Sequence, residues 1–529
     1  MHLKLLYVAA GLVTAAGAVI PQPGYTIQTP VSYDLLARSG TSSLFEMNLP
    51  NNGVYFDGKV LLLDLKGSRT DMGVDTGVLL GDRWAENYQS LISSLLSSVT
   101  TNAKLSALIQ EVLEFVMDRQ WEENCVPHTP SKFIDELAGL SAGALSAFSI
   151  PDVGKMVSRG IVLANLPGDG DDVAKMLLAD LSPKTMERLV GYGAALKKLT
   201  PLSIKDILAS IKFGHNCDMY ALWGSRTTNS TLMTGRNLDW SKDTGVSKSK
   251  LVTVFHPTDG GFAHATIGFA GLWGAIAGMS SQGLSVHEAN LESKYNTLKG
   301  FPWVLRLRHV MEEGSDLESG LAAFNSGPNT VGFNHQITSA KDAAMYDAER
   351  NPRARGAVLL ETDKVHTATF FDNDERESTN GGNPFVNAVF RTNHGYDDET
   401  RANYNWPLDG GAFKDSSHRY DLFVDMFNNA PEYSLSYVDA VSICSILGSK
   451  GGEDPYVCNG DYADGSNVIS AAFLPGSSVM YAAWENGHAE GWTPAACNSY
   501  VEIDLSAFSS GHGGGPGRGL VSSLDRSGL

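Results

Sequence analysis

The residues best suited to chemistry in this chain are Cys217 and the segment from Arg236 to Trp240. Cys217 stands where a helical half of the chain gives way to a β-rich half, a position that suits a processing site. If the peptide bond between Asn216 and Cys217 were cut, Cys217 would carry a thiol and a free α-amino group together. An unperturbed α-amino group titrates near about 7.7–8.0, so it can accept the thiol proton close to neutral pH. The pattern therefore predicts a nucleophile and its base on one residue.

The spacing of these residues resembles that of a known family. The pattern is Cys-x(18)-Arg-Asn-x-Asp-Trp, formed by Cys217, Arg236, Asn237, Asp239 and Trp240. It resembles the N-terminal nucleophile (Ntn) hydrolases of the choloylglycine hydrolase, penicillin V acylase, acid ceramidase and isopenicillin N acyltransferase group. The resemblance implies an enzyme that acts on carbon–nitrogen bonds other than peptide bonds.

Further short segments are similar to this group in the expected order. MSSQGLSVHEANL resembles the segment that ends in an oxyanion-hole asparagine, here Asn290, and TVGFNHQITSAKDAAMYDAE resembles a strand pair that places Asn334 in the polar site and Glu349 at its end. VFRTNHG resembles the segment that contributes an arginine, here Arg391. Upstream, FIDELAGLSAGAL is similar to a helix of the acyltransferase branch's pro-region. These matches are spread over most of residues 130–485.

The resemblance implies a role for each of these residues. Attack by Cys217 on an amide carbonyl creates an oxyanion, which the side-chain amides of Asn290 and Asn334 would stabilise. Asp239 would hold the new α-amino group by a charge-assisted hydrogen bond. Arg236 and Arg391 would pair with Asp239 and keep it ionised, and their charges would lower the pKa of the thiol.

Each residue also has a plainer interpretation. Cys217 would be a buried structural thiol or a disulfide partner, and Arg236 with Asp239 would form a salt bridge at a strand end. Asn290 and Asn334 would be turn residues, and Arg391 a surface charge. The histidines show no metal-ligand spacing such as H-E-x-x-H, and LPGDGDDV lacks the spaced ligands of a calcium loop, so no metal or other cofactor is expected.

The elements that must position these residues fall into two parts. Apolar residues recur at helical spacing from about residue 82 to 212, and Ser182-Pro183 predicts a helix start there. From Cys217 onward, short β-rich runs dominate, among them residues 343–349, while residues 302–314 and 315–326 read as helices, the second opened by a capping box of Ser315 and Glu318. The predicted fold class is α+β, a four-layer αββα sandwich preceded by a mainly helical region.

The two ends of the chain indicate export. Residues 1–18 combine a short basic start, an uncharged apolar run and a small-x-small site, which predicts a signal peptide, and the Gly/Ser-rich residues 506–529 predict a flexible tail. The predicted helical fragment is therefore 19–216 and the catalytic domain 217–505. No other run is long and apolar enough to predict a transmembrane segment. Asn229-Ser230-Thr231 is a glycosylation sequon in the turn predicted after the first strand of the catalytic domain.

Charge and cysteine content narrow the class further. The net charge of −19 argues against nucleic acid and anionic membrane surfaces as partners. Five cysteines in an exported chain predict up to two disulfides and one odd thiol. At least one bridge is expected among Cys444, Cys458 and Cys497, which leaves Cys125 or Cys217 as the free residue.

Taken together, the sequence predicts a secreted or lysosomal, self-processing cysteine hydrolase. It would cleave the amide bond of an N-acylated small molecule or lipid through a thioester on Cys217, and the two fragments of the precursor would stay associated. The alternatives are an acyltransferase, a phospholipase B-like ester hydrolase on the same fold, or a secreted glycoprotein without catalysis.

Overall fold

The computed structural model of this 529-residue chain describes most of its sequence. The described residues are 26–30, 32–49, 60–97, 99–211, 216–240, 246–291, 293–373, 385–403, 411–447, 467–485 and 493–506. The predicted signal peptide, the tail beyond residue 506 and Cys458 lie outside these ranges. Among the described helices, none combines the length and apolar character needed to cross a membrane.

Two β-sheets form the centre of the described structure. The first has seven strands in the order β1 (Ile27–Gln28), β17 (Tyr500–Asp504), β16 (Val479–Trp484), β15 (Asn467–Leu474), β6 (Met233–Asp239), β5 (Asn216–Leu222) and β14 (Ala388–Arg391). The second has ten strands in the order β13 (Thr367–Phe370), β12 (Ala357–Thr362), β11 (Phe333–Ser339), β10 (Leu284–Asn290), β9 (Ala277–Ser280), β8 (His264–Phe269), β7 (Lys250–Pro257), β4 (Val60–Gly67), β3 (Ser42–Asn48) and β2 (Ser32–Ser39).

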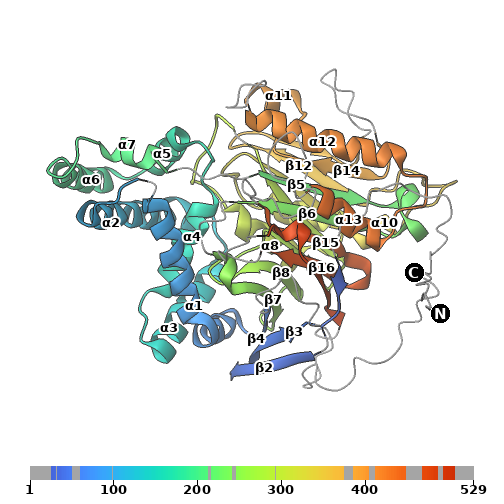
Figure 1. The fold of residues 1–529 in the computed structure, drawn as a ribbon, viewed down its shortest axis with the longest axis horizontal. Helices are drawn as coiled ribbons and strands as arrows, with labels where there is room; N and C mark the ends of the chain where they lie inside the picture. The colour runs from blue at the N-terminus through green and yellow to red at the C-terminus, as the bar shows by residue number, and fades with distance from the viewer. Residues whose placement is uncertain are drawn as a thin grey trace, which may run out of the picture.

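Helices cover the outer faces of the two sheets. In the catalytic part these are α8 (Trp303–Glu313), α9 (Leu317–Phe324), α10 (Ala340–Ala343), α11 (Asp398–Ala402), α12 (Gly411–Asn429) and α13 (Tyr437–Leu447). Helices α12 and α13 pack on the seven-stranded sheet, whereas α8 and α9 pack on the ten-stranded sheet, and β10 faces β5 and β6 across the middle (Figure 1). The order helix, sheet, sheet, helix confirms the predicted α+β sandwich.

The N-terminal region is helical over most of its length. Its helices are α1 (Arg69–Ser97), α2 (Ala103–Gln120), α3 (Ser131–Phe148), α4 (Val153–Ala164), α5 (Gly170–Leu178), α6 (Pro183–Leu196) and α7 (Ile204–Ala209). Helices α1 and α3 cross so closely that a Cβ atom on Gly143 would lie 2.1 Å from the backbone oxygen of Val74. Small residues permit that contact. The segment that resembled a pro-region helix is therefore a packing surface for α1.

Strands β1 to β4 are a feature that the sequence analysis did not anticipate. They come from residues 27–67, ahead of the helices, yet β1 pairs with β17 and β4 pairs in parallel with β7. The fragment before Cys217 thus contributes strands to both sheets. If the chain is cut at Cys217, these pairings would still join the two pieces.

Two local predictions in the catalytic part are wrong. Residues 343–349 do not form a strand, because α10 ends there and the Asp347 carboxylate accepts the backbone N–H groups of Glu349 and Arg350 in a turn. Helix α9 is capped by Asp316, whose carboxylate accepts the backbone N–H of Ser319, and not by Ser315. The predicted cap at Ser182, ahead of Pro183 in α6, is confirmed.

The cysteines also differ from expectation. Cys125, Cys217 and Cys444 are free and buried, so there are three free thiols where the sequence predicted one. Cys497 is disulfide-bonded, and none of the described cysteines is its partner. The pairing of the late cysteines therefore stays a prediction.

Candidate active site at the start of strand β5

Cys217 is the second residue of β5, which lies between β6 and β14 in the seven-stranded sheet. It is paired with Leu238 of β6, and both side chains belong to the apolar core that fills the space between the sheets. The next residue, Asp218, is paired with Asn237 and lies on the opposite face, because side chains alternate along a strand. The thiol therefore points between the two sheets, whereas its neighbour points toward α12 and α13.

The side chain of Arg236 lies between the Cys217 thiol and the carboxylate of Glu288. The Arg236 Nη2 atom is 3.2 Å from the Cys217 sulfur and 2.9 Å from Oε1 of Glu288, which reaches across from β10. Burial raises the pKa of the Cys217 thiol and Glu288 adds to this effect, although Arg236 and the backbone N–H of Asp239 act in the opposite direction. The sulfur is therefore protonated in the uncut chain and needs a base.

Two side chains hold the backbone of Cys217 from the other face. The amide N–H of Cys217 donates to Oδ1 of Asn393 over 2.7 Å, and its carbonyl oxygen accepts from Nη1 of Arg419 over 2.6 Å. Nη2 of Arg419 also donates to Oδ1 of Asn393 over 2.7 Å. Arg419 lies on α12, where Asp415 one turn earlier accepts from its Nη2 atom over 3.0 Å.

Neither Asn393 nor Arg419 was predicted from the sequence. Asn393 lies two residues after Arg391 in the VFRTNHG segment, from which Arg391 alone was predicted. Arg419 carried no signal of its own, because its role depends on how α12 crosses the sheet. The opposite charge of Asp415 at helical spacing was the single available hint.

Asp239 is buried at the end of β6, paired in register with Asn216. Its Oδ1 atom accepts from Nδ2 of Asn467 over 2.9 Å, while its Oδ2 atom has no hydrogen-bond partner among the described residues. Burial raises the pKa of Asp239 well above its usual range, although the charge of Arg419 opposes this. Burial thus favours the neutral form of this carboxyl group, and one of its oxygens has no partner among the described residues.

The predicted ion pairs of Asp239 are wrong. Arg236 pairs with Glu288, and Arg391 pairs with Glu361, whose Oε1 atom is 2.7 Å from its Nε atom. Arg391 also donates to Oδ1 of Asn373. Neither arginine keeps Asp239 ionised, because each has a carboxylate of its own and burial dominates at Asp239.

The two predicted oxyanion residues lie near this centre in different ways. Asn290 ends β10, and its backbone oxygen accepts from Nδ2 of Asn393 over 2.9 Å, so it adjoins the group that holds Cys217. Asn334 on β11 donates its amide hydrogens to the carbonyl oxygens of Thr392 and His394. Its amide thus braces the segment that carries Asn393, and an oxyanion role for Asn334 stays a prediction that this geometry does not favour.

Two other predicted positions lie on the surface. Asn229 is exposed in the turn between β5 and β6, with a φ of 56°, which asparagine tolerates better than most residues. That placement is open to a glycan. Glu349 is exposed in the turn after α10, away from any strand end, so its predicted place in the site is wrong.

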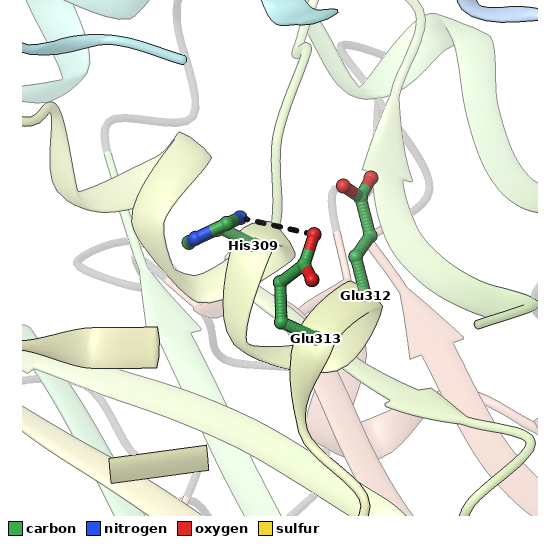
Figure 2. Close-up of side chains that lie close together, drawn as sticks. All are labelled: His309, Glu312 and Glu313. Carbon is green, nitrogen blue, oxygen red and sulfur yellow. Dashed lines mark ion pairs between the residues drawn. The ribbon is translucent and has the colours of Figure 1, made fainter. Parts of the chain in front are cut away.

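One group of residues in the described structure has the spacing of metal ligands. His309, Glu312 and Glu313 on α8 offer ligand atoms within 4.8 Å of one another, and Figure 2 shows the ion pair between His309 and Glu313. However, the Nζ atom of Lys132 is 2.6 Å from Glu312 and 2.7 Å from Glu313. An ammonium group thus already lies where a metal ion would bind.

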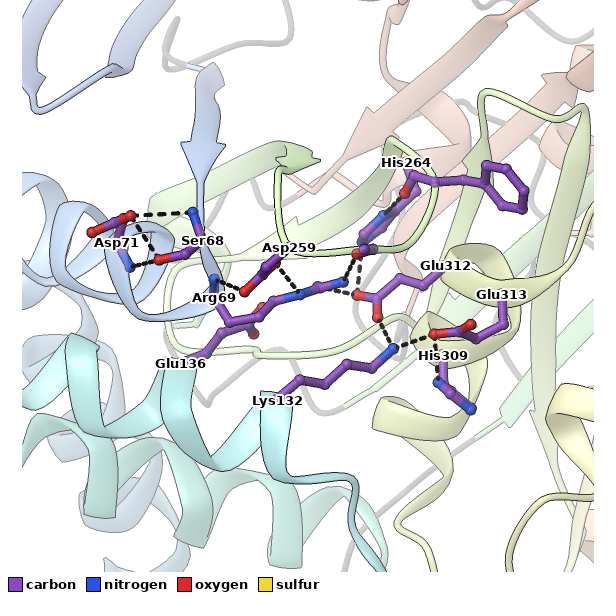
Figure 3. Close-up of polar contacts among 12 residues, drawn as sticks. Ser68, Arg69, Asp71, Lys132, Glu136, Asp259, His264, His309, Glu312 and Glu313 are labelled. Atoms are coloured by element: carbon purple, nitrogen blue, oxygen red, sulfur yellow. Dashed lines mark hydrogen bonds and ion pairs between the residues drawn. The ribbon is translucent and has the colours of Figure 1, made fainter.

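These carboxylates belong to a larger buried charge cluster, the α1–α3–α8 joint. It comprises Arg69, Lys132, Glu136, His264 and Glu312, which Figure 3 labels, together with Arg308. Arg308 forms a bidentate pair with Glu136, at 2.6 and 2.7 Å, and Arg69 reaches both glutamates. The joint connects helices of the N-terminal region to the catalytic part.

An apolar pocket of about 50 Å³ lies between the N-terminal helices and the catalytic part. It is lined by α1 and α4 on one side and by Trp240 and residues 269–272 on the other. Trp240 directly follows Asp239, and its side chain packs against the same core as Cys217 and Leu238. Cys217 itself is not among the residues that line the pocket.

Comparison with known protein families gives one match. Residues 225–432 match the family model of acyl-coenzyme A:6-aminopenicillanic acid acyl-transferase. The family resemblance is confirmed. The match begins after Cys217 and includes Arg236, Asp239, Asn290, Asn393 and Arg419. It agrees with the prediction that the chain is an enzyme of the amidohydrolase and acyltransferase group.

Comparison with solved structures finds weakly similar chains. An N-acylethanolamine-hydrolyzing acid amidase ortholog from Caenorhabditis elegans has 11% identity and a TM-score of 0.33, covering 49% of this chain and 93% of its own. A mutant conjugated bile acid hydrolase from Clostridium perfringens has 14% identity and a TM-score of 0.34, with 56% and 95% covered. Penicillin V acylase from Agrobacterium tumefaciens has 12% identity and a TM-score of 0.33, with 56% and 89% covered. Likeness of this degree does not indicate a substrate, and no curated protein matches the chain.

Proposed function

We propose that this chain is a self-processing cysteine hydrolase that cleaves the linear amide bond of an N-acylated small molecule or lipid. The observation that supports this best is the surroundings of Cys217. Its sulfur lies 3.2 Å from Nη2 of Arg236, and its backbone N–H and carbonyl groups are bound by Asn393 and Arg419. Asp239, the strand partner of Asn216, has one oxygen without a hydrogen-bond partner among the described residues. This arrangement suits a residue that becomes a chain terminus.

Processing would begin with the uncut peptide bond. The Cys217 sulfur attacks the carbonyl carbon of Asn216, the C–N bond to Cys217 breaks, and the thiol proton passes to the departing nitrogen. Water then hydrolyses the Asn216 thioester, which releases the carboxylate of Asn216 and restores the thiol. Cys217 is left with a free α-amino group, while its carbonyl oxygen stays bound to Arg419.

The new amino group supplies what the uncut site lacks. It would form directly after Asn216, the strand partner of Asp239, and a positive ammonium beside that carboxyl group would lower the pKa of Asp239 and create a charge-assisted pair. In its neutral form the amine accepts the thiol proton as the sulfur attacks a substrate amide. The proton then passes to the leaving amine, and water releases the acyl group from the Cys217 thioester.

The apolar pocket beside Trp240 would receive the acyl group. Its volume of about 50 Å³ is well below the roughly 300–1,000 Å³ usual for small-molecule sites, so the pocket would have to widen to take an acyl chain. Its walls come from both fragments, so the N-terminal fragment would be part of the mature binding site. This supports an acyl chain and not a polar peptide as the group transferred.

Acyl transfer is the second candidate, and the description of the matching family model favours it. An amine in place of water would attack the same thioester and form a new amide. An ester substrate of the phospholipase B type would pass through the same intermediate. Because a signal peptide is predicted, the proposal includes secretion or delivery to a lysosome. For the same reason it includes a glycan on Asn229.

A substrate screen with two variants tests the function. N-acyl amino acids, N-acylethanolamines, ceramides, bile-salt conjugates and penicillin V are incubated with the protein, with and without an added amine. We expect release of free acid from at least one amide, and no release by Cys217→Ala or by a folded Asn393→Ala variant. An active Cys217→Ala protein would refute the proposal. A new amide formed faster than free acid would favour the acyltransferase.

A further inference from the structure

Glu361 on β12 is a fully buried carboxylate that binds a whole loop. Its Oε1 atom accepts from Nε of Arg391 over 2.7 Å and from the backbone N–H of Tyr396 over 2.9 Å. Its Oε2 atom accepts from the backbone N–H groups of Tyr396 and Asp397, each over 2.8 Å. Arg391 ends β14, and Asp397 is the N-cap of α11. Glu361 therefore binds both ends of the connection 392–397.

The middle of this connection is held from the neighbouring strand. Asn334 on β11 lies opposite Glu361 in register. Its amide group donates to the carbonyl oxygens of Thr392 and His394, the two residues that flank Asn393. The carboxylate can only accept hydrogen bonds and the amide nitrogen can only donate them, so the two side chains bind complementary groups of one loop. We call this pair, Glu361 and Asn334, the loop cradle.

The residue that the loop cradle holds in place is Asn393. Its Oδ1 atom accepts from the backbone N–H of Cys217 and from Nη2 of Arg419, each over 2.7 Å. Its Nδ2 atom donates to the backbone oxygen of Asn290 over 2.9 Å. These three bonds fix one orientation of the Asn393 amide. Its position relative to Cys217 depends in turn on the backbone that the loop cradle binds.

We infer that Glu361 is a positioning residue for the reaction at Cys217, because it sets where the Asn393 oxygen meets the Cys217 nitrogen. In the mature protein of the proposed function that nitrogen is the α-amino group, whose lone pair must face the thiol to accept its proton. A displacement of about 1 Å in such a group can lower a rate about a hundredfold. The effect on rate rests on the proposed function. The bond from residue 217 to Asn393, however, is present in the uncut chain.

One substitution removes the action of Glu361 and keeps its shape. In Glu361→Gln the charge is lost, and one acceptor oxygen becomes an NH₂ group that cannot accept from a backbone N–H. The matched control is Glu136→Gln in the α1–α3–α8 joint. Glu136 is also fully buried and bound by an arginine, Arg308, at 2.6 and 2.7 Å. Both variants therefore weaken a buried ion pair, but only Glu361→Gln alters the loop cradle.

The first measurement needs no catalysis. Hydrogen exchange of the residue-217 amide is followed by fragmentation mass spectrometry in the uncut Cys217→Ala chain, with and without each substitution. Exchange in β6 serves as the internal reference, which separates local loosening from global unfolding. We expect Glu361→Gln to speed exchange at residue 217 about tenfold relative to β6, because Asn393 no longer holds that N–H. Glu136→Gln should leave this ratio unchanged.

The second measurement uses the chain with Cys217 intact and a substrate that the screen identifies. We expect kcat of Glu361→Gln to fall about thirtyfold per folded molecule with KM within about twofold, because the loop cradle positions a reacting group and does not bind substrate. Glu136→Gln should keep both constants. If Glu361→Gln does not fold, Asn334→Ala removes the other half of the loop cradle, and the same rise in exchange at residue 217 is expected.

Three results would overturn the inference. They are unchanged exchange at residue 217, a change in KM without a change in kcat, and equal effects of Glu361→Gln and Glu136→Gln. A wild-type protein that turns over no substrate is a different outcome. It would overturn the proposed function, and the exchange measurement would still decide whether Glu361 positions Asn393.

Discussion

The molecule buries two clusters of charge, and they differ in how completely the charges are matched. In the α1–α3–α8 joint, Arg308 pairs with the carboxylates of Glu136 and Glu312. Lys132, at the edge of the joint, also pairs with Glu312. Around Cys217 the match is incomplete. Among the described residues, Oδ2 of Asp239 and the Nε and Nη1 atoms of Arg236 have no hydrogen-bond partner.

This difference indicates which cluster is structural and which one is chemical. Burial of unmatched polar groups is costly, so such groups persist where a further partner completes them. At the joint each charged side chain has an ion-pair partner, including the Glu312 Oε2 atom, which has no hydrogen bond among the described residues but lies 2.6 Å from Nζ of Lys132. The cluster fastens α3 to α8. For Asp239 the proposed missing partner is a positive group, which cleavage before Cys217 would create. Burial raises the pKa of one carboxyl group in each cluster. In the joint this group is Glu136, and in the site it is Asp239.

The largest effect is expected from breaking the joint. Glu136→Leu leaves Arg308 and Arg69 buried with fewer opposite charges, and breaking a buried ion pair in this way costs about 3–5 kcal/mol of unfolding free energy. Urea denaturation of the variant should show this loss. Glu313→Leu, which removes a half-exposed partner of Lys132, is the control and should cost less than about 1 kcal/mol. Equal losses in the two variants would show that the joint is not a matched structural cluster.

The next effect concerns the pH dependence of stability at the site. Burial raises the pKa of Asp218 to about 6, so the folded chain binds a proton there more tightly than the unfolded chain does. The resulting stability is complete below about pH 4 and is lost as the pH rises through about 6, a span worth about 3 kcal/mol. Urea denaturation of the uncut Cys217→Ala protein between pH 4 and 7, with and without Asp218→Asn, measures the difference. Because Asn resembles the protonated carboxyl group, the Asp218 protein should become less stable than the Asp218→Asn variant as the pH rises. The same pH dependence in both proteins would contradict this account of the site.

A third effect separates chemistry from stability at Asp239. Asp239→Asn keeps the shape of the side chain and its contact with Asn467 but cannot become a negative partner for the α-amino group. We expect turnover to fall about a hundredfold, because that pair positions the amine, while the melting temperature stays the same or rises. Rates measured on protein with equal folded fractions make the comparison. A large loss of stability with normal turnover would show that Asp239 is a structural residue, as the residues of the joint are.

The smallest effect is expected at the rim of the joint. Lys132 is one-fifth exposed. If the Lys132 ammonium were removed, Glu312 would still form ion pairs with Arg308 and Arg69. Lys132→Met should therefore lower the unfolding free energy by about 1 kcal/mol or less. Calorimetry measures whether Zn²⁺ or Mn²⁺ binds to the wild-type protein and to the Lys132→Met variant. Tight metal binding by the wild-type protein would show that Lys132 does not fill the space between Glu312 and Glu313.

Much of the site could be predicted because it lies on one hairpin. Cys217, Arg236 and Asp239 are on adjacent strands, β5 and β6, and their spacing carries the relationship. Long-range partners were harder. Asn393 was missed although its segment was found, because the sequence does not show which side chain of an extended segment turns toward Cys217. Arg391 was predicted from that segment, and Asn334 was predicted to stabilise an oxyanion, although its amide bonds to the carbonyl groups beside Asn393.

The fold shows the same limit. Helices and most strands of the catalytic part follow from local patterns, whereas the pairing of β4 with β7 joins residues far apart in the chain. Arg419 was invisible for a similar reason, since it reaches Cys217 only after α12 has packed on the sheet. The predicted ion pairs of Asp239 failed because Glu288 and Glu361, which take up the two arginines, come from the opposite sheet.

The most direct test is the chemical state of Cys217 in mature, active protein. Intact-mass measurement and N-terminal sequencing of the purified protein should give two fragments, one of which begins Cys-Asp-Met-Tyr with an unblocked α-amino group. Full activity in a chain whose Asn216–Cys217 bond is whole, or in which the Cys217 sulfur is held in a disulfide, would contradict the proposed mechanism.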